Sequence, residues 1–130
     1  MATELVTDRW HGSRNVETEV AKPTAQQIED AIRALDGGVH TLLTISAPGR
    51  GHLSVGGGEN ALYVVYATRD GDCFFSACRI TDSSELVRLN AGGQVGEFPA
   101  NRCVDLETAL SAASDFAETT ELDPAIQWKE

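Results

Sequence analysis

The chain has 130 residues, which is enough for one domain whose hydrophobic core needs no disulfide or metal to stabilise it. Hydrophobic residues make up 42% of the chain and charged residues 23%, the balance of a folded globular protein rather than of a disordered one. Twenty acidic residues against ten basic ones give a net charge of −10, which argues against nucleic acid or an anionic membrane as the direct partner.

The amino-terminal residues are mostly polar, and we expect residues 1–14 to form a flexible segment in front of a single domain that spans residues 15–130. Trp10 is the exception, because its side chain is large enough to pack onto the domain. The start has no apolar signal-peptide core, and no stretch is apolar enough to span a membrane. With three cysteines, an odd number, the chain favours a reducing cytoplasm.

The first predicted elements are a short strand and a helix. Apolar and acidic residues alternate over residues 15–20, which predicts a strand. Thr24 and Gln27 have the spacing of a helix-capping box, and the glycine pair at 37–38 marks the end of that helix. Three apolar residues recur at helical spacing and define its buried face: Ile28, Ile32 and Leu35.

The middle of the chain predicts several strands, separated by turns rich in glycine and aspartate. The predicted strands are His40–Ser46, His52–Val55, Ala61–Ala67, Cys73–Ile80 and Leu86–Leu89. Because the connections are short, these strands are expected to pair antiparallel. Residues 61–67 are apolar almost without a break, as expected of a strand that is covered on both faces.

A second helix is predicted to begin at Asp105, which can cap it. Its apolar face contains Leu106, Ala109, Leu110, Ala113, Phe116 and Ala117. Its polar face contains Glu107, Ser111, Ser114, Asp115 and Glu118. Residues 122–128 are expected to return as an edge strand, with Trp128 buried against the core. The predicted fold class is α+β, a curved antiparallel sheet of about five to seven strands packed with two helices.

No pattern of catalytic or metal-binding residues emerges from the sequence. The histidines are scattered, without a metal-binding spacing, at His11, His40 and His52. Cys73 and Cys78 lie five residues apart on a predicted strand, so their side chains face opposite sides and do not favour a shared zinc. Cys103 has no base near it in the sequence that would activate it as a nucleophile. We expect all three thiols to be core residues. We therefore predict no catalytic, cofactor-binding or metal-binding residues, no cofactor and no enzymatic activity.

Three segments, in this order, resemble a known family: IEDAIRALDGG, LSVGGGENALYVVYATRDG and the chain from Gly92 to Glu130. Over residues 15–130 the sequence resembles the immunity proteins of bacterial polymorphic toxin systems, and in particular the immunity family commonly encoded beside nucleic-acid deaminase toxins. The features that carry the resemblance are the Tyr63-Val64-Val65 strand, Gly92-Gly93 with Pro99, and Leu122-Asp123-Pro124 leading to Trp128. Thr120 departs from the family, in which the end of the last helix often carries glycine.

The resemblance implies a cytoplasmic protein without catalytic activity, which binds a cognate toxin and occludes its active site or substrate path. A toxin that acts on nucleic acid needs a basic groove, and an acidic protein can occupy that groove in place of phosphate. The acids of the hairpin turns are the preferred candidates for partner binding: Glu59, Asp70, Asp72, Asp82 and Glu85. A second candidate set is the exposed face of the last helix: Glu107, Asp115 and Glu118.

Two other functions remain open from the sequence. One is a small-ligand-binding or hydrolytic domain, in which Tyr63, Tyr66 and a cysteine line a pocket on the sheet. The other is a structural or accessory protein. The sequence leaves the oligomeric state and the identity of the toxin open.

Overall fold

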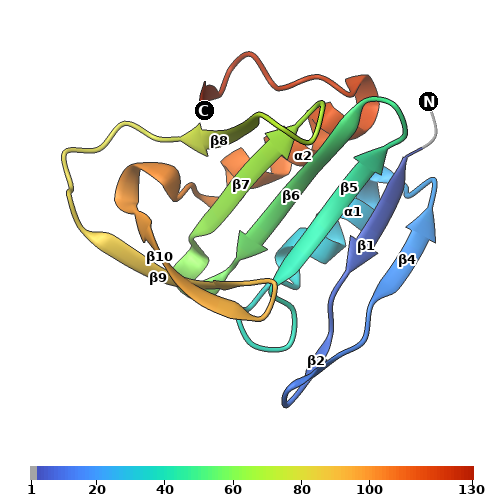
Figure 1. The fold of residues 1–130 in the computed structure, drawn as a ribbon, viewed down its shortest axis with the longest axis horizontal. Coiled ribbons are helices and arrows are strands. Elements are labelled where there is room, and N and C mark those ends of the chain that lie inside the picture. Colours follow the sequence, from blue (N-terminus) through green and yellow to red (C-terminus); the bar gives the residue numbers. More distant parts are fainter. Residues whose placement is uncertain (1–2) are drawn as a thin grey trace.

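The computed structural model describes residues 3–130, which form eleven strands and two α-helices in an α+β fold (Figure 1). Seven strands form one open antiparallel sheet, in the order β11-β8-β7-β6-β5-β1-β4, so the predicted fold class is confirmed. These strands are β1 (Glu4–Thr7), β4 (Thr18–Ala21), β5 (Leu42–Ala47), β6 (Gly51–Gly57), β7 (Tyr63–Thr68), β8 (Phe74–Cys78) and β11 (Gln127–Lys129). Two further hairpins pair β2 (Trp10–His11) with β3 (Arg14–Asn15), and β9 (Leu86–Ala91) with β10 (Gln94–Pro99).

Both helices, α1 (Ala25–Arg33) and α2 (Leu106–Thr119), lie on the same face of the large sheet (Figure 1). The predicted capping box begins α1: the Gln27 N–H donates to the Thr24 hydroxyl, and the Thr24 N–H donates to the Gln27 side chain. Asp105 caps α2 by accepting a hydrogen bond from the Thr108 N–H. Side chains from the helices and from alternate positions of the central strands form the main core, among them Ile28, Ile32, Leu43, Ile45, Leu53, Val55, Val65 and Phe116.

The β9–β10 hairpin crosses the opposite face of the sheet, near one end of β6 and β7 (Figure 1). Beneath it lies a second, smaller core of Val64, Leu89 and Cys103. Strand β7 is therefore covered on both faces at Val64, as its apolar sequence predicts, whereas Tyr66 further along the strand is only partly buried. Strand β10 was not predicted. The turn before it is made by Gly92 and Gly93, whose φ angles of 72° and 81° lie in the left-handed region that favours glycine.

Residues 1–14 were expected to be flexible, but those that the structure describes are ordered in the fold. Residues 1 and 2 lie outside the described residues. Strand β1 lies inside the large sheet, hydrogen-bonded to both β4 and β5, and its Leu5 is buried. Trp10 packs onto the domain as expected, because its ring lies against the backbone of Gly93. The domain therefore includes residues before the expected boundary at residue 15. A four-residue strand with one buried side chain gives too weak an alternation for the sequence to reveal it.

The carboxyl-terminal strand forms at the sheet edge as predicted, but it is shorter, and Trp128 is only partly buried. The indole N–H of Trp128 donates to the Asp123 carbonyl at 3.0 Å, and the ring packs against the main core. The expectation of a largely buried Trp128 is therefore too strong. A strand of three residues at the edge has a neighbour on one side only, which leaves part of the ring uncovered.

One of the three thiols also differs from the prediction. Cys78 and Cys103 are buried, whereas Cys73 is exposed at the start of the β7–β8 return. Cys73 precedes β8 and belongs to the turn, so it has no sheet neighbour to cover it.

Thr120 adopts the conformation that glycine commonly supplies at a helix end. Its φ of 59° is left-handed, and its N–H donates to the Phe116 carbonyl at 2.8 Å. A residue with a Cβ costs about 1–2 kcal/mol in this conformation relative to the right-handed one. The helix end keeps the glycine-type geometry even though the residue is threonine.

Candidate partner interface

The structure does not bring the five turn acids together. Asp70 and Asp72 lie in the turn before β8, and Asp82 and Glu85 lie in the connection after it. Strand β8 has five residues and separates the two pairs by roughly 16 Å. Glu59 lies in a single 3₁₀ turn, Glu59–Ala61, between β6 and β7. All of these residues except Glu59 are exposed.

Glu59 points into the protein and connects two segments of the fold. Its Oε2 accepts a hydrogen bond from the Asn90 N–H at 2.9 Å. Its side chain fills the space above Gly37, where a Cβ atom would come within 2.1 Å of the Glu59 Cδ. The Asn90 side-chain amide donates to the Gly37 carbonyl at 3.1 Å. Glu59 thus links the loop after α1 to strand β9, and a partner would reach it only with difficulty.

Asp70 has a similar local role. Its Oδ1 accepts hydrogen bonds from the N–H groups of Asp72 and Cys73, at 2.8 and 2.9 Å. These backbone donors, that of Cys73 first, hold the pKa of Asp70 below its ordinary value of 3.8. The carboxylate of Asp70 therefore stabilises the turn, whereas the side chains of Asp72, Asp82 and Glu85 are directed to solvent.

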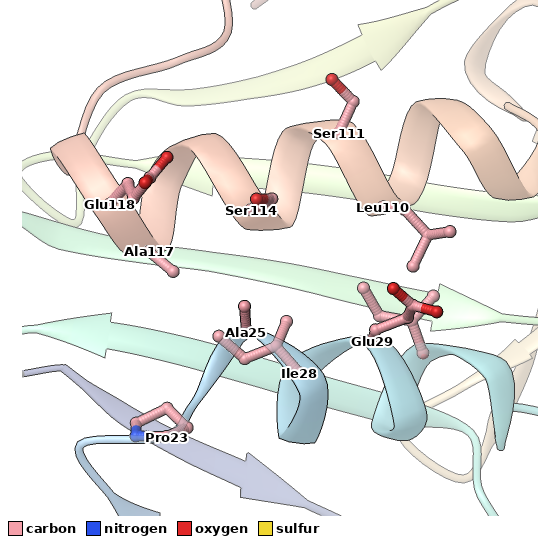
Figure 2. Close-up of a pocket in the computed structure, with 10 residues that line it drawn as sticks. Pro23, Ala25, Ile28, Glu29, Leu110, Ser111, Ser114, Ala117 and Glu118 are labelled. Carbon is pink, nitrogen blue, oxygen red and sulfur yellow. The ribbon is translucent and has the colours of Figure 1, made fainter.

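The two helices leave a groove of about 440 Å³ between them (Figure 2). Its floor is apolar and consists of Ile28 and Ile32 from α1, with Leu110 and Ala117 from α2. Glu29 borders the groove on α1, and Glu118 borders it on α2 (Figure 2). The groove therefore combines an apolar floor with carboxylates on both sides.

The outward side of α2 is polar and has a glutamate near each end. Glu107, Ser111, Ser114 and Glu118 recur at intervals of four, three and four residues, so they form one ridge along the helix. Partial burial raises the pKa of the adjacent Asp115 above its ordinary value of 3.8, and the nearby charges of Asp123 and Glu118 raise it further. The negative charge on this surface is thus dense enough for neighbouring carboxylates to repel one another.

The ion pairs found within residues 3–130 compensate little of this charge. Arg33 on α1 pairs with Glu29 at 3.0 Å, and Arg69 pairs with Glu121 at the end of α2. All four side chains are about half exposed, and such pairs contribute at most about 1 kcal/mol each.

The sheet face opposite the helices is partly open and has a different chemistry. Alternation and strand register place hydroxyl and aromatic residues there: Thr44, Ser46, His52, Ser54, Tyr66, Thr68, Phe74 and Ser76. The rings of Tyr66 and Phe74 lie 6.4 Å apart, and Phe74 is 43% exposed. Beside them, a cleft of about 390 Å³ reaches Phe98 and Arg102.

The geometry does not support the alternative pocket with both tyrosines. Tyr63 and Tyr66 are three residues apart on β7, so their side chains lie on opposite faces of the sheet. Tyr63 is buried on the helix side, and burial raises its pKa above 10.0. Tyr66 lies on the open side, among the residues of the cleft. The two rings therefore line no common site.

Within residues 3–130, no three side chains of the histidine, cysteine, aspartate or glutamate type are placed to hold a metal ion. In the same part of the chain, no helix has the length and apolar character needed to cross a membrane.

Comparisons with known proteins agree with the fold and identify the family. Among curated proteins, no sequence matches the chain. A solved structure described as a hypothetical protein from Neisseria gonorrhoeae has the same fold, with a TM-score of 0.57 and 11% sequence identity. The alignment covers 95% of this chain and 92% of that one. The family model described as Immunity protein Imm1 matches residues 16–130, nearly the whole described domain. The chain therefore belongs to the Imm1 family of immunity proteins.

Proposed function

We propose that this protein neutralises one cognate bacterial toxin by binding it directly, and that the complex covers the active site of the toxin or the path of its substrate. The observation that carries the proposal is the family match over residues 16–130. We further propose that the protein acts in the cytoplasm and that the toxin is a nucleic-acid-targeting enzyme of the deaminase type. Such a toxin needs a basic surface for its substrate, and the net charge of −10 suits a basic partner.

Charge and contact have separate roles in this proposal. Asp70 and Asp72 lie in the turn before β8, and Asp82 and Glu85 lie in the connection after it. These four acids attract a basic toxin over a distance, which raises the association rate. Glu59 contributes indirectly, because it fixes the loop after α1. Tight binding also requires a few well-packed side chains at the centre of an interface of roughly 800 Å² per partner.

The test uses the toxin encoded next to this protein, in a catalytically inactive form. Isothermal titration should give 1:1 binding with nanomolar affinity or better, about −12 kcal/mol. Co-expression of this protein should protect cells from the active toxin. Stopped-flow mixing across a salt series should show association slowing markedly with added salt, while dissociation changes less. If the protein neither binds nor protects, the proposed function is wrong. If the association rate stays constant across the salt series, the attraction by acidic residues is wrong.

A further inference from the structure

We infer that the groove between α1 and α2 is the surface that receives the toxin, and that its occupant is a basic amphipathic segment. In this arrangement an apolar side chain of the segment lies on the groove floor, while lysine or arginine side chains pair with Glu29 and Glu118. The inference rests on the proposed function and assigns it to a surface other than the turns.

The floor of the groove is apolar and is formed by rigid elements. Ile28 and Ile32 are buried members of the main core, and Leu110 and Ala117 pack against that core from α2. Ala25 and Ala117 face each other across the groove (Figure 2), and their short side chains keep it open. An apolar side chain entering here would lose its contact with water without any rearrangement of the helices.

The rim of the groove supplies negative charge that the protein itself leaves uncompensated. Within residues 3–130, neither Glu118 nor the adjacent Asp115 takes part in an ion pair. Glu29 is paired only with Arg33 of its own helix, in a half-exposed pair that an incoming arginine can replace at small cost. A cationic segment would therefore relieve the repulsion among these carboxylates.

The same charges argue against other occupants and other surfaces. A second copy of this chain would bring an equally acidic groove against this one, and like charges would oppose the contact. The open sheet face places Phe74 beside Arg102 in its cleft, and Lys129 lies opposite Ser76 at the edge of that face. The rim of the open face thus mixes these cations with the nearby carboxylates of Asp70 and Glu130. The charged residues that line the helix groove are Glu29 and Glu118, so the groove suits a basic toxin better.

Two groove variants and two matched controls test the inference. Glu118→Lys reverses a charge on the groove rim, and Ser114→Arg places a long cationic side chain across the groove. Glu17→Lys and Ser13→Arg make the same chemical changes at exposed positions of the amino-terminal region, outside the groove. All four positions are exposed, so each variant should keep the unfolding midpoint of the wild type. Titration with the inactive toxin should show affinity losses of at least about 30-fold for the groove variants and less than about threefold for the controls.

Carboxyl footprinting of the wild-type complex provides a test that depends on no variant. Carbodiimide coupling followed by mass spectrometry should show that the toxin protects Glu29 and Glu118 and leaves Asp72 and Glu85 reactive. Groove variants that bind like the wild type, or equal losses in the controls, would overturn the inference. So would a Phe74→Ala variant that loses affinity while Glu118→Lys does not, because the interface would then lie on the open sheet face. In each of these cases the wild-type protein would still bind the toxin and protect cells, so only the assignment of the groove would be wrong. If the proposed function itself is wrong, the wild-type protein neither binds the toxin nor protects cells.

Discussion

Replacement of Asp8 by alanine should destabilise the fold strongly, although Asp8 lies in a stretch whose sequence predicts a flexible segment. Asp8 is buried, and its carboxylate accepts four hydrogen bonds. Oδ1 accepts from the backbone N–H groups of Thr41 and Leu42, at 2.7 and 3.1 Å. Oδ2 accepts from the Thr41 hydroxyl and, at 2.8 Å, from the indole N–H of Trp10. The Thr41 hydroxyl in turn accepts from the Gly93 N–H, so one side chain connects β1, β5 and the β9–β10 turn.

The magnitude follows from the donors that would be left without an acceptor. In Asp8→Ala the Thr41 and Leu42 N–H groups lose their acceptor, and each buried unpaired donor costs about 1–3 kcal/mol. The Thr41 hydroxyl can turn away and the indole N–H can reach water, so their cost is smaller. We expect a loss of about 3–4 kcal/mol, a large share of the roughly 5–15 kcal/mol that stabilises a typical domain. Asp8→Asn keeps one oxygen for the two backbone donors and should lose about 1–2 kcal/mol.

Urea unfolding at pH 7 would measure both losses, and a double-mutant cycle with Thr41→Val would assign them. Thr41→Val removes the hydroxyl that connects Asp8 to Gly93, so its effect should be smaller when Asp8 is already alanine. We expect a coupling energy of about 1 kcal/mol between the two sites. A loss below about 1 kcal/mol for Asp8→Ala, or strict additivity in the cycle, would refute the network as a determinant of stability.

Three further predictions concern the thiols, the carboxyl-terminal strand and the start of α2. Of the three thiols in the folded protein, only Cys73 should react with a thiol reagent, while Cys78 and Cys103 react only after unfolding. The reaction of Cys73 should become faster above pH 9, because the charges of Glu130 and Asp70 raise the pKa of its thiol. Toxin binding should survive replacement of all three by serine or alanine in a variant that folds; stoichiometric zinc in protein purified without added metal would contradict this. Trp128→Ala should lower the free energy of unfolding in urea by about 2 kcal/mol, which is less than the loss expected for a fully buried tryptophan. An unchanged unfolding midpoint would show that β11 does not pack against the rest of the fold. Asp105→Ala should cost about 1 kcal/mol at pH 7. Hydrogen bonds from the Thr108 side chain and from the Thr108 N–H lower the pKa of Asp105 in the folded state, so the difference should shrink as the pH falls through 3.8 and below. A difference independent of pH would contradict the charged cap.

The elements predicted correctly are those whose signals are local in sequence. The capping box of Thr24 and Gln27 correctly marks the start of α1, although the helix ends at Arg33, before the predicted stop at Gly37 and Gly38. The apolar stripe of α2 repeats at helical spacing and correctly predicts that helix. The uninterrupted apolar run of β7 correctly indicates cover on both faces. Strand β1 lacks such a signal, because it is held by pairing with residues about 40 positions away in β5.

The candidate site was harder to predict, because a sequence shows which residues are acidic but not where their carboxylates point. Glu59 follows a run of glycines and is predicted, like Asp70 and Asp82, to lie in a turn at the surface. In the structure its side chain points into the protein and packs against Gly37. The groove depends on the packing of α1 against α2, two helices that are far apart in the chain. The polar face of α2 was visible in the sequence, but its position beside α1 was not.

Two groups among the acids of this protein have different physical roles. Asp8, Glu59 and Asp123 accept hydrogen bonds from other elements of the fold. Asp123, for example, accepts from the Ser111 hydroxyl of α2 at 2.6 Å. Acids such as Glu118 extend into solvent from helices whose opposite faces already hold the core together. Neutralising an acid of the first group leaves buried donors unpaired, whereas changing one of the second alters mainly the surface potential. The choice of partner can therefore change through substitutions on the outer faces of α1 and α2 without loss of stability. The residues that would contact the partner there are not the residues that stabilise the fold.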